Sequence, residues 1–91
     1  MNPKNSKMIC NALNRVAGQV RGVSQMVEEG RYCIDILYQI RAVKAALAKA
    51  ETRILKAHAE CCVEDAIQSG DAIRQREKFN ELVEVFAQAK L

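Results

Sequence analysis

The chain has 91 residues, of which 49% are hydrophobic and 27% are charged. This length allows a single domain, residues 1–91, with a modest core, and the composition excludes a disordered chain. No apolar run approaches the ~20 residues that a membrane-spanning helix needs, and residues 1–13 lack the apolar stretch of a secretion signal. We therefore expect a cytoplasmic protein outside the membrane, in which the four cysteines are reduced thiols.

Charge is distributed unevenly along the chain. Residues 1–56 carry ten Lys and Arg against four Asp and Glu, a net charge of +6, whereas residues 57–91 carry four against seven, a net charge of −3. A basic half is typical of proteins that bind a polyanion, chiefly nucleic acid. The alternative interpretation is a solvated surface that has no charged partner.

The first predicted helix follows a frayed start at residues 1–5 and is capped by Asn5 or Ser6. Its apolar residues recur in alternating steps of four and three, the heptad pattern of a helix that packs closely on another helix. Gly30 is expected to end this helix because glycine accepts the left-handed conformation. The row consists of Ile9, Leu13, Val16, Val20, Val23 and Val27.

A second helix is predicted from near Arg31 to about Ser69, since no glycine or proline interrupts that stretch. A helix so long is improbable in an isolated small globule and is typical of the spine of an oligomer. Gly70 ends it, and Asp71 can cap a third helix. The sequence therefore predicts an all-α protomer of three helices with a long second helix. Apolar residues of the third helix are Ile73, Phe79, Leu82, Val83 and Phe86.

Three residues of the second helix can bind a soft metal ion. His58 and Cys62 are four residues apart and so share a helix face. At about 100° per residue, Cys33 falls on the same stripe as both. However, 25 residues of α-helix between Cys33 and His58 span ~37 Å. One straight helix cannot bring both to a single ion, but two antiparallel copies related by a two-fold axis can.

In such a pairing, residue i of one chain lies opposite residue j of the other, and the two residue numbers add up to about 93. The helices then cross around Ala46 and Leu47. Small side chains there permit a close approach, and Lys44 and Glu51 on the same stripe must pair or extend to the edge. The dimer would have two identical sites, each with Cys33 of one chain and His58 and Cys62 of the other. The apolar residues that the dimer would bury are Leu37, Ile40, Leu47 and Leu55.

Two thiolates and one imidazole form a three-coordinate site that suits Cu(I), because Zn(II) prefers four ligands. Cys10 and Cys61 are interpreted as packing or spare thiols. The main alternative is a sulfur-sensing protein in which Cys33 and Cys62 of different chains join through a persulfide or disulfide bridge. An enzyme with a Cys–His pair is disfavoured, since no orienting carboxylate or oxyanion hole is evident. A purely structural helical oligomer is the remaining alternative.

Five segments of the chain carry motifs in a characteristic order: residues 15–22, 32–37, 39–43, 58–63 and 65–67. Through these segments the chain resembles the CsoR/RcnR/FrmR family of metal-sensitive transcriptional repressors over nearly its whole length. The resemblance implies a three-helix protomer, an antiparallel dimer, a disc-like tetramer, and a protein that is not an enzyme. It also implies that the apo protein binds double-stranded operator DNA through a basic face of the first two helices, and that the inducer releases it. The Cys-His-Cys pattern of copper members falls on Cys33, His58 and Cys62.

Some features of this sequence differ from those of other members of the family that it resembles. The single histidine disfavours nickel and cobalt sensing, and Pro3 has no free amine of the kind formaldehyde-responsive members use. Copper members have an outer-shell tyrosine, here Tyr32, and a glutamate of the third helix, here Glu81 or Glu77. Without a helix-turn-helix, phosphate contacts and DNA shape should dominate operator recognition. The residues expected to bind DNA are Arg15, Arg21, Lys49 and Arg53.

Overall fold

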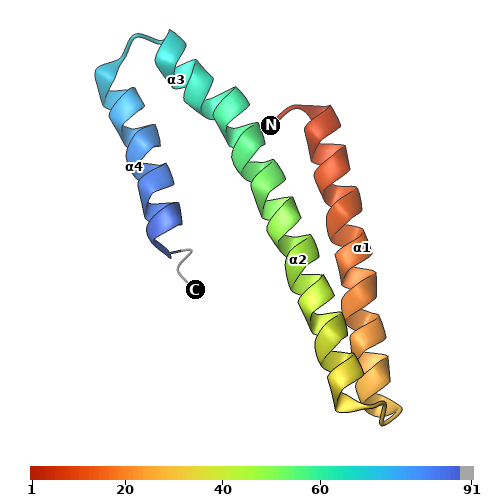
Figure 1. Cartoon of the computed structure of the whole chain (residues 1–91). Helices are drawn as coiled ribbons and strands as arrows, with labels where there is room; N and C mark the ends of the chain where they lie inside the picture. Colours follow the sequence, from red (N-terminus) through yellow and green to blue (C-terminus); the bar gives the residue numbers. More distant parts are fainter. Residues whose placement is uncertain (89–91) are drawn as a thin grey trace. The chain divides into compact units, whose positions relative to one another are not determined.

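The computed structural model describes residues 1–88, in which every regular element is helical (Figure 1). Three helical stretches follow one another, which confirms the predicted all-α protomer with a long second helix. The chain forms two compact units, one of residues 2–55 and one that begins at Lys56, and α2 belongs to both. The elements are α1 (Pro3–Glu28), α2 (Cys33–His58), the π-helical turn η1 (Ala59–Val63), α3 (Glu64–Gln68) and α4 (Ala72–Gln88).

Helix α1 begins earlier than the sequence predicted. Asn2 caps it, because its side-chain Oδ1 accepts a hydrogen bond of 2.8 Å from the backbone N–H of Asn5. Pro3 occupies the first turn, where its fixed φ suits the helix and its missing N–H leaves no bond unmade. The prediction of a frayed start with Asn5 or Ser6 as cap was therefore wrong. An asparagine followed by proline was the signal that could have located the cap.

The C-terminus of α1 has the geometry expected at Gly30. This glycine has a φ of +69°, and its N–H donates to the carbonyl of Val27 while the N–H of Arg31 donates to the carbonyl of Met26. These two bonds form a Schellman motif, which satisfies carbonyl groups that the helix itself leaves free. The chain thereby turns sharply into α2.

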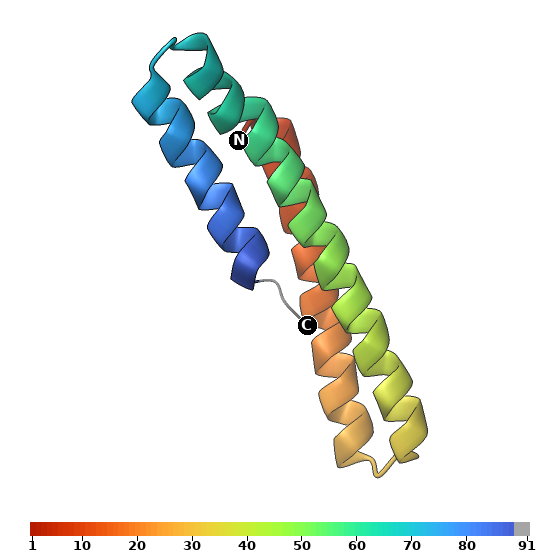
Figure 2. The same cartoon turned by 60° about the vertical axis from the view of Figure 1, so that its left-hand side comes forward.

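In the unit of residues 2–55, α1 and α2 run side by side in opposite directions (Figures 1 and 2). From α1, Ile9 and Val16 are buried, in agreement with the heptad row predicted for that helix. From α2, Ala50 is buried and Val43 is half-buried. The pairing is incomplete, because three of the other four members of the α1 row keep much of their surface exposed: Leu13 38%, Val20 47% and Val27 60%.

The second unit contains the end of α2 followed by η1, α3 and α4. The helical run from residue 33 to residue 68 confirms the predicted long second helix, but it is not uniformly α-helical. Ala59–Val63 form a single π turn, in which hydrogen bonds join residues five apart. Helix α4 packs against η1 and α3.

The turn between α3 and α4 also follows the sequence prediction. Gly70 has a φ of +69° and ends α3. Asp71 Oδ1 accepts hydrogen bonds from the backbone N–H groups of Ile73 at 2.9 Å and Arg74 at 3.4 Å, and so caps α4. Among the helices of residues 1–88, none is long and apolar enough to cross a membrane.

Replacing Gly30 by alanine should destabilise the protein by about 1–2 kcal/mol, because a Cβ is strained at positive φ. Gly22 is a matched control, since it lies inside α1 and a Cβ there would meet no atom within 4 Å. Gly22→Ala should raise the stability by about 0.5–1 kcal/mol. Urea unfolding followed by circular dichroism measures both changes. A Gly30→Ala variant as stable as the unmodified protein would contradict the account of this turn.

Candidate functional site

Cys33 is the first residue of α2 and is exposed to solvent as a free thiol. The preceding residue, Tyr32, keeps 68% of its surface exposed. The backbone N–H of Ile36 donates to the carbonyl of Tyr32, so the tyrosine stands at the start of the helix. Both side chains are accessible to a ligand or to a second protein chain.

His58 and Cys62 lie at the junction of α2 and η1. His58 is the last residue of α2, Cys62 is the fourth residue of η1, and both side chains are half-buried. The π turn thus begins directly after His58 and contains Cys62. Such turns are rare and frequently occur at functional sites. Cys61 is also a half-buried free thiol in this turn.

Cys33 and His58 mark the two ends of the same 26-residue α-helix. At the α-helical rise, the 25 steps between them span ~37 Å. Within residues 1–88, the structure brings together no group of three or more His, Cys, Asp or Glu side chains that could hold a metal ion. A site built from Cys33, His58 and Cys62 therefore requires more than one chain.

Between Cys33 and His58, α2 has a second row of residues at heptad spacing. We call it the α2 seam. Its apolar members remain accessible, with exposed fractions of 53% for Leu37, 37% for Ile40, 45% for Leu47 and 41% for Ile54. Exposed apolar residues in such a continuous row are typical of a helix that packs on another protein surface. The α2 seam consists of Cys33, Leu37, Ile40, Lys44, Leu47, Glu51, Ile54 and His58.

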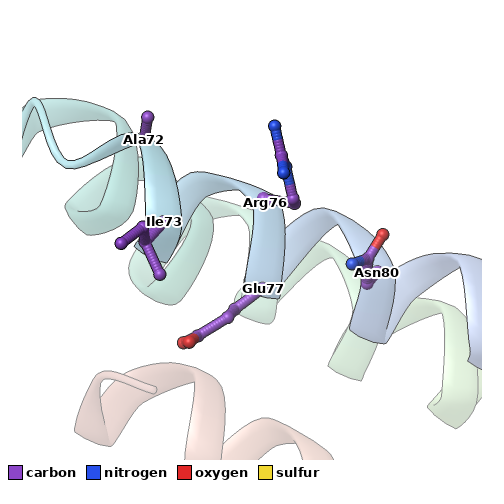
Figure 3. A pocket seen from close by; sticks show the side chains of 5 residues that line it. All are labelled: Ala72, Ile73, Arg76, Glu77 and Asn80. Carbon is purple, nitrogen blue, oxygen red and sulfur yellow. The ribbon is translucent and has the colours of Figure 1, made fainter.

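The two glutamates considered as outer-shell residues lie in different environments on α4. Glu81 forms an ion pair with Lys78, with 3.6 Å between Glu81 Oε2 and Lys78 Nζ. Glu77 borders a shallow hollow along α4 and leaves the helix on the same side as Ile73, whereas Arg76 and Asn80 lie on the other side (Figure 3). The assignment of Glu81 as the outer-shell residue stays a prediction.

Arg15 and Arg21 belong to a continuous polar face of α1 that lies opposite its buried row. The helical spacing sets Gly18 and Gly22 in the middle of this face, with cations and amides on both sides. A Cβ at Gly22 would meet nothing within 4 Å, so the backbone is open to a close approach there. Sequence reasoning identified the two arginines and missed the amides, although the same spacing reveals them. The exposed polar residues of the face are Lys4, Lys7, Asn11, Asn14, Arg15, Arg21 and Gln25.

Helix α2 adds a short basic row of its own. Lys49 and Arg53, both predicted to bind DNA, are four residues apart and exposed. Lys56 follows three residues later on the same face, is also exposed, and was missed. In the described residues, the only ion pair joins Lys78 to Glu81, so the cations of α1 and α2 are free to meet an external anion.

A family model described as metal-sensitive transcriptional repressor matches residues 5–88. The chain belongs to this family. The matched residues include nearly all of each helix that the structure describes. This match confirms the family resemblance predicted from the sequence. The family is one of transcriptional repressors rather than of enzymes.

Curated relatives of this chain carry the name copper-sensing transcriptional repressor. CsoR of Bacillus subtilis is 48% identical over 89 residues, which cover 94% of this chain and 85% of that protein. RicR of Mycobacterium tuberculosis is 48% identical over 58 residues, which cover 64% of this chain and 60% of that protein. The similarity to the first relative extends over nearly the whole of this chain.

Solved structures have the same fold. The crystal structure of the copper-sensing repressor CsoR with Cu(I) from Geobacillus thermodenitrificans matches with a TM-score of 0.88 and 42% identity, covering 97% of this chain and 88% of that one. The nickel-responsive regulator InrS matches with a TM-score of 0.77 and 32% identity, covering 88% and 90%. A variant of the formaldehyde-responsive regulator FrmR from Salmonella enterica, at 24% identity and a TM-score of 0.81, agrees in fold alone.

Proposed function

We propose that the protein is a Cu(I)-responsive repressor that binds operator DNA in its apo form and is released when Cu(I) binds. Each ion would be held by Cys33 of one chain and by His58 and Cys62 of its partner, with one ion per protomer. The observation that carries this proposal is the placement of Cys33 and His58 at the two ends of α2, with an exposed apolar row between them. The Cu(I)-bound relative of the same fold supports the choice of metal.

The donor set suits this ion. Cys33 and Cys62 are free thiols, and His58 can supply a nitrogen one helical turn from Cys62. Soft sulfur donors favour Cu(I), which accepts three ligands. Metal-bound histidines generally hydrogen-bond an outer-shell group through their other ring nitrogen. We assign that role to Tyr32 or to Glu81.

We propose that the DNA surface is formed by Arg15 and Arg21 of α1 and by Lys49 and Arg53 of α2. All four side chains are exposed, and none of the residues around them in the described chain neutralises them by an ion pair. The open backbone at Gly22 permits a phosphate group to approach α1 closely. An oligomer, which we take to be a tetramer built from α2-paired dimers, would repeat this positive surface and strengthen its field. Such a regulator acts in the cytoplasm.

The π turn gives this proposal a physical route from the ligands to the rest of the chain. Cys62 lies in η1, and α4 packs on η1 and α3. Drawing Cys62 and His58 toward the partner's Cys33 would shift η1 and, with it, the helices that pack on it. Linkage requires that DNA weaken Cu(I) binding by the same factor as Cu(I) weakens DNA binding.

Anaerobic titration of the protein–DNA complex with Cu(I) tests this function, using a duplex selected by the protein from a random library. The unmodified protein should leave the DNA as the sites fill. Cys33→Ala, His58→Ala and Cys62→Ala should each stay bound, because a three-coordinate site loses a full ligand. Cys10→Ala and Cys61→Ala are the matched controls and should respond as the unmodified protein does.

Equal DNA affinity for the apo and Cu(I)-loaded forms would contradict the copper response. If, in addition, a persulfide donor released the DNA and Cys33→Ala or Cys62→Ala abolished that release while His58→Ala did not, the protein would be a sulfur sensor instead. His58 separates the two functions, since a bridge between two thiols needs no third ligand.

The DNA surface is tested by the salt dependence of binding. Arg15→Ala and Arg21→Ala should lower the affinity for the duplex, and each lost phosphate contact should reduce the steepness of the log–log salt plot by about 0.9. Both variants should keep the Cu(I) affinity of the unmodified protein. Arg74→Ala removes an exposed cation of α4 and serves as control. An unchanged salt slope in the Arg15→Ala, Arg21→Ala double variant would place the DNA surface elsewhere.

A further inference from the structure

The α2 seam contains two charged residues in an otherwise apolar row. Lys44 and Glu51 are both exposed, and neither takes part in an ion pair within residues 1–88. Seven residues separate them, which is ~10 Å along the helix, so they do not neutralise one another in the chain. Burying either charge without a partner would strongly destabilise the interface. A surface that packs on another chain must therefore supply a counter-charge to each.

The α2 seam is symmetric about its own midpoint. Four of its positions precede the point between Ala45 and Ala46, and the other four follow it at the same distances along the sequence. When two copies pack antiparallel with these midpoints in line, every seam residue faces a seam residue of the partner. The numbers i and j of two facing residues then add up to about 91. This sum is close to the value near 93 that the predicted metal ligands require. The facing pairs are Cys33 with His58, Leu37 with Ile54, Ile40 with Glu51, and Lys44 with Leu47.

We infer that, in this antiparallel dimer, Lys44 of each chain forms an ion pair with the partner's Glu51 and that the two pairs fix the register of the α2 helices. The inference rests on the dimer of the proposed function. It assigns to Lys44 and Glu51 a role in partner recognition, and the partner that fits the α2 seam is a second copy of this chain.

The reach of the two side chains supports the pairing. In the antiparallel arrangement, Lys44 and the partner's Glu51 are offset by about four residues, or ~6 Å along the axis. Side chains on an α-helix tilt toward its N-terminus. Because the two helices run in opposite directions, Lys44 and the partner's Glu51 tilt toward each other across this offset.

The same tilt directs the two Lys44 side chains away from the two-fold axis, which they would otherwise crowd. Shifted registers lose these features. If one α2 helix slides along the other so that i + j rises by seven, the side chains of Lys44 and the partner's Glu51 tilt away from each other. If i + j falls by seven, the two residues are about eleven residues apart, or ~16 Å along the axis. Both slips also move Cys33 away from the partner's His58. A charged pair in an apolar seam typically selects a register rather than adding net stability.

Charge exchange tests the inference. Lys44→Glu and Glu51→Lys should each weaken dimerisation of the apo protein about tenfold or more, because each places like charges together in the seam. The double variant restores opposite charges and should dimerise within about threefold of the unmodified protein. Ala42→Glu and Thr52→Lys are the controls, since they add charge to exposed positions of α2 outside the seam. Sedimentation equilibrium measures the dimer dissociation constant, and circular dichroism shows whether each variant is helical.

A double variant as weak as either single variant, or single variants that dimerise like the controls, would overturn the inference. The proposed function is judged separately, by Cu(I) binding and DNA release in the unmodified protein. A dimer that binds Cu(I) through Cys33, His58 and Cys62 but is indifferent to charge at Lys44 and Glu51 would refute the register pair alone. A folded protein that is monomeric at micromolar concentration would refute the pair and the shared site together.

Discussion

The fixed rise of the α-helix is the constraint on which the functional arrangement depends. Helix α2 places Cys33 at one end and His58 at the other, and no rotamer change can close a span of ~37 Å. A metal ion that needs both residues must therefore draw them from two chains. Because such a site would draw on both ends of α2, an ion bound there would alter how two associated chains are held together.

The long helices α1 and α2 each have several faces that differ in their residues and their exposure. Helix α1 turns Ile9 and Val16 inward and presents its arginines on the opposite face. Helix α2 has one row next to α1 and a second, exposed row that begins with Cys33 and ends with His58. Because these rows lie on different faces, the residues that stabilise the protomer need not compete for the same positions with those proposed to join two protomers or to contact DNA. The π turn follows His58 and contains Cys62, and α4 packs on this turn.

Much of this arrangement could be predicted from the sequence because it depends on local chemistry. Gly30 and Gly70 end helices since they accept positive φ, and Asp71 caps α4 through a short polar side chain. The π turn could not be predicted, because no residue type specifies it. The cap at Asn2 was overlooked since Asn5 and Ser6 are equally good capping types. Helical periodicity does not decide between Glu77 and Glu81, because the two residues are four apart and so share a face of α4.

The central claim, a metal site shared between chains, is tested most directly by mixing two inactive variants. Cys33→Ala alone and the His58→Ala, Cys62→Ala double variant alone should each lack tight Cu(I) binding. When the two are refolded together under anaerobic conditions and the mixed dimer is isolated by two affinity tags, one intact site should reappear, with Cys33 from one chain and His58 and Cys62 from the other. A mixed dimer that binds Cu(I) no better than its two parents would contradict the shared site.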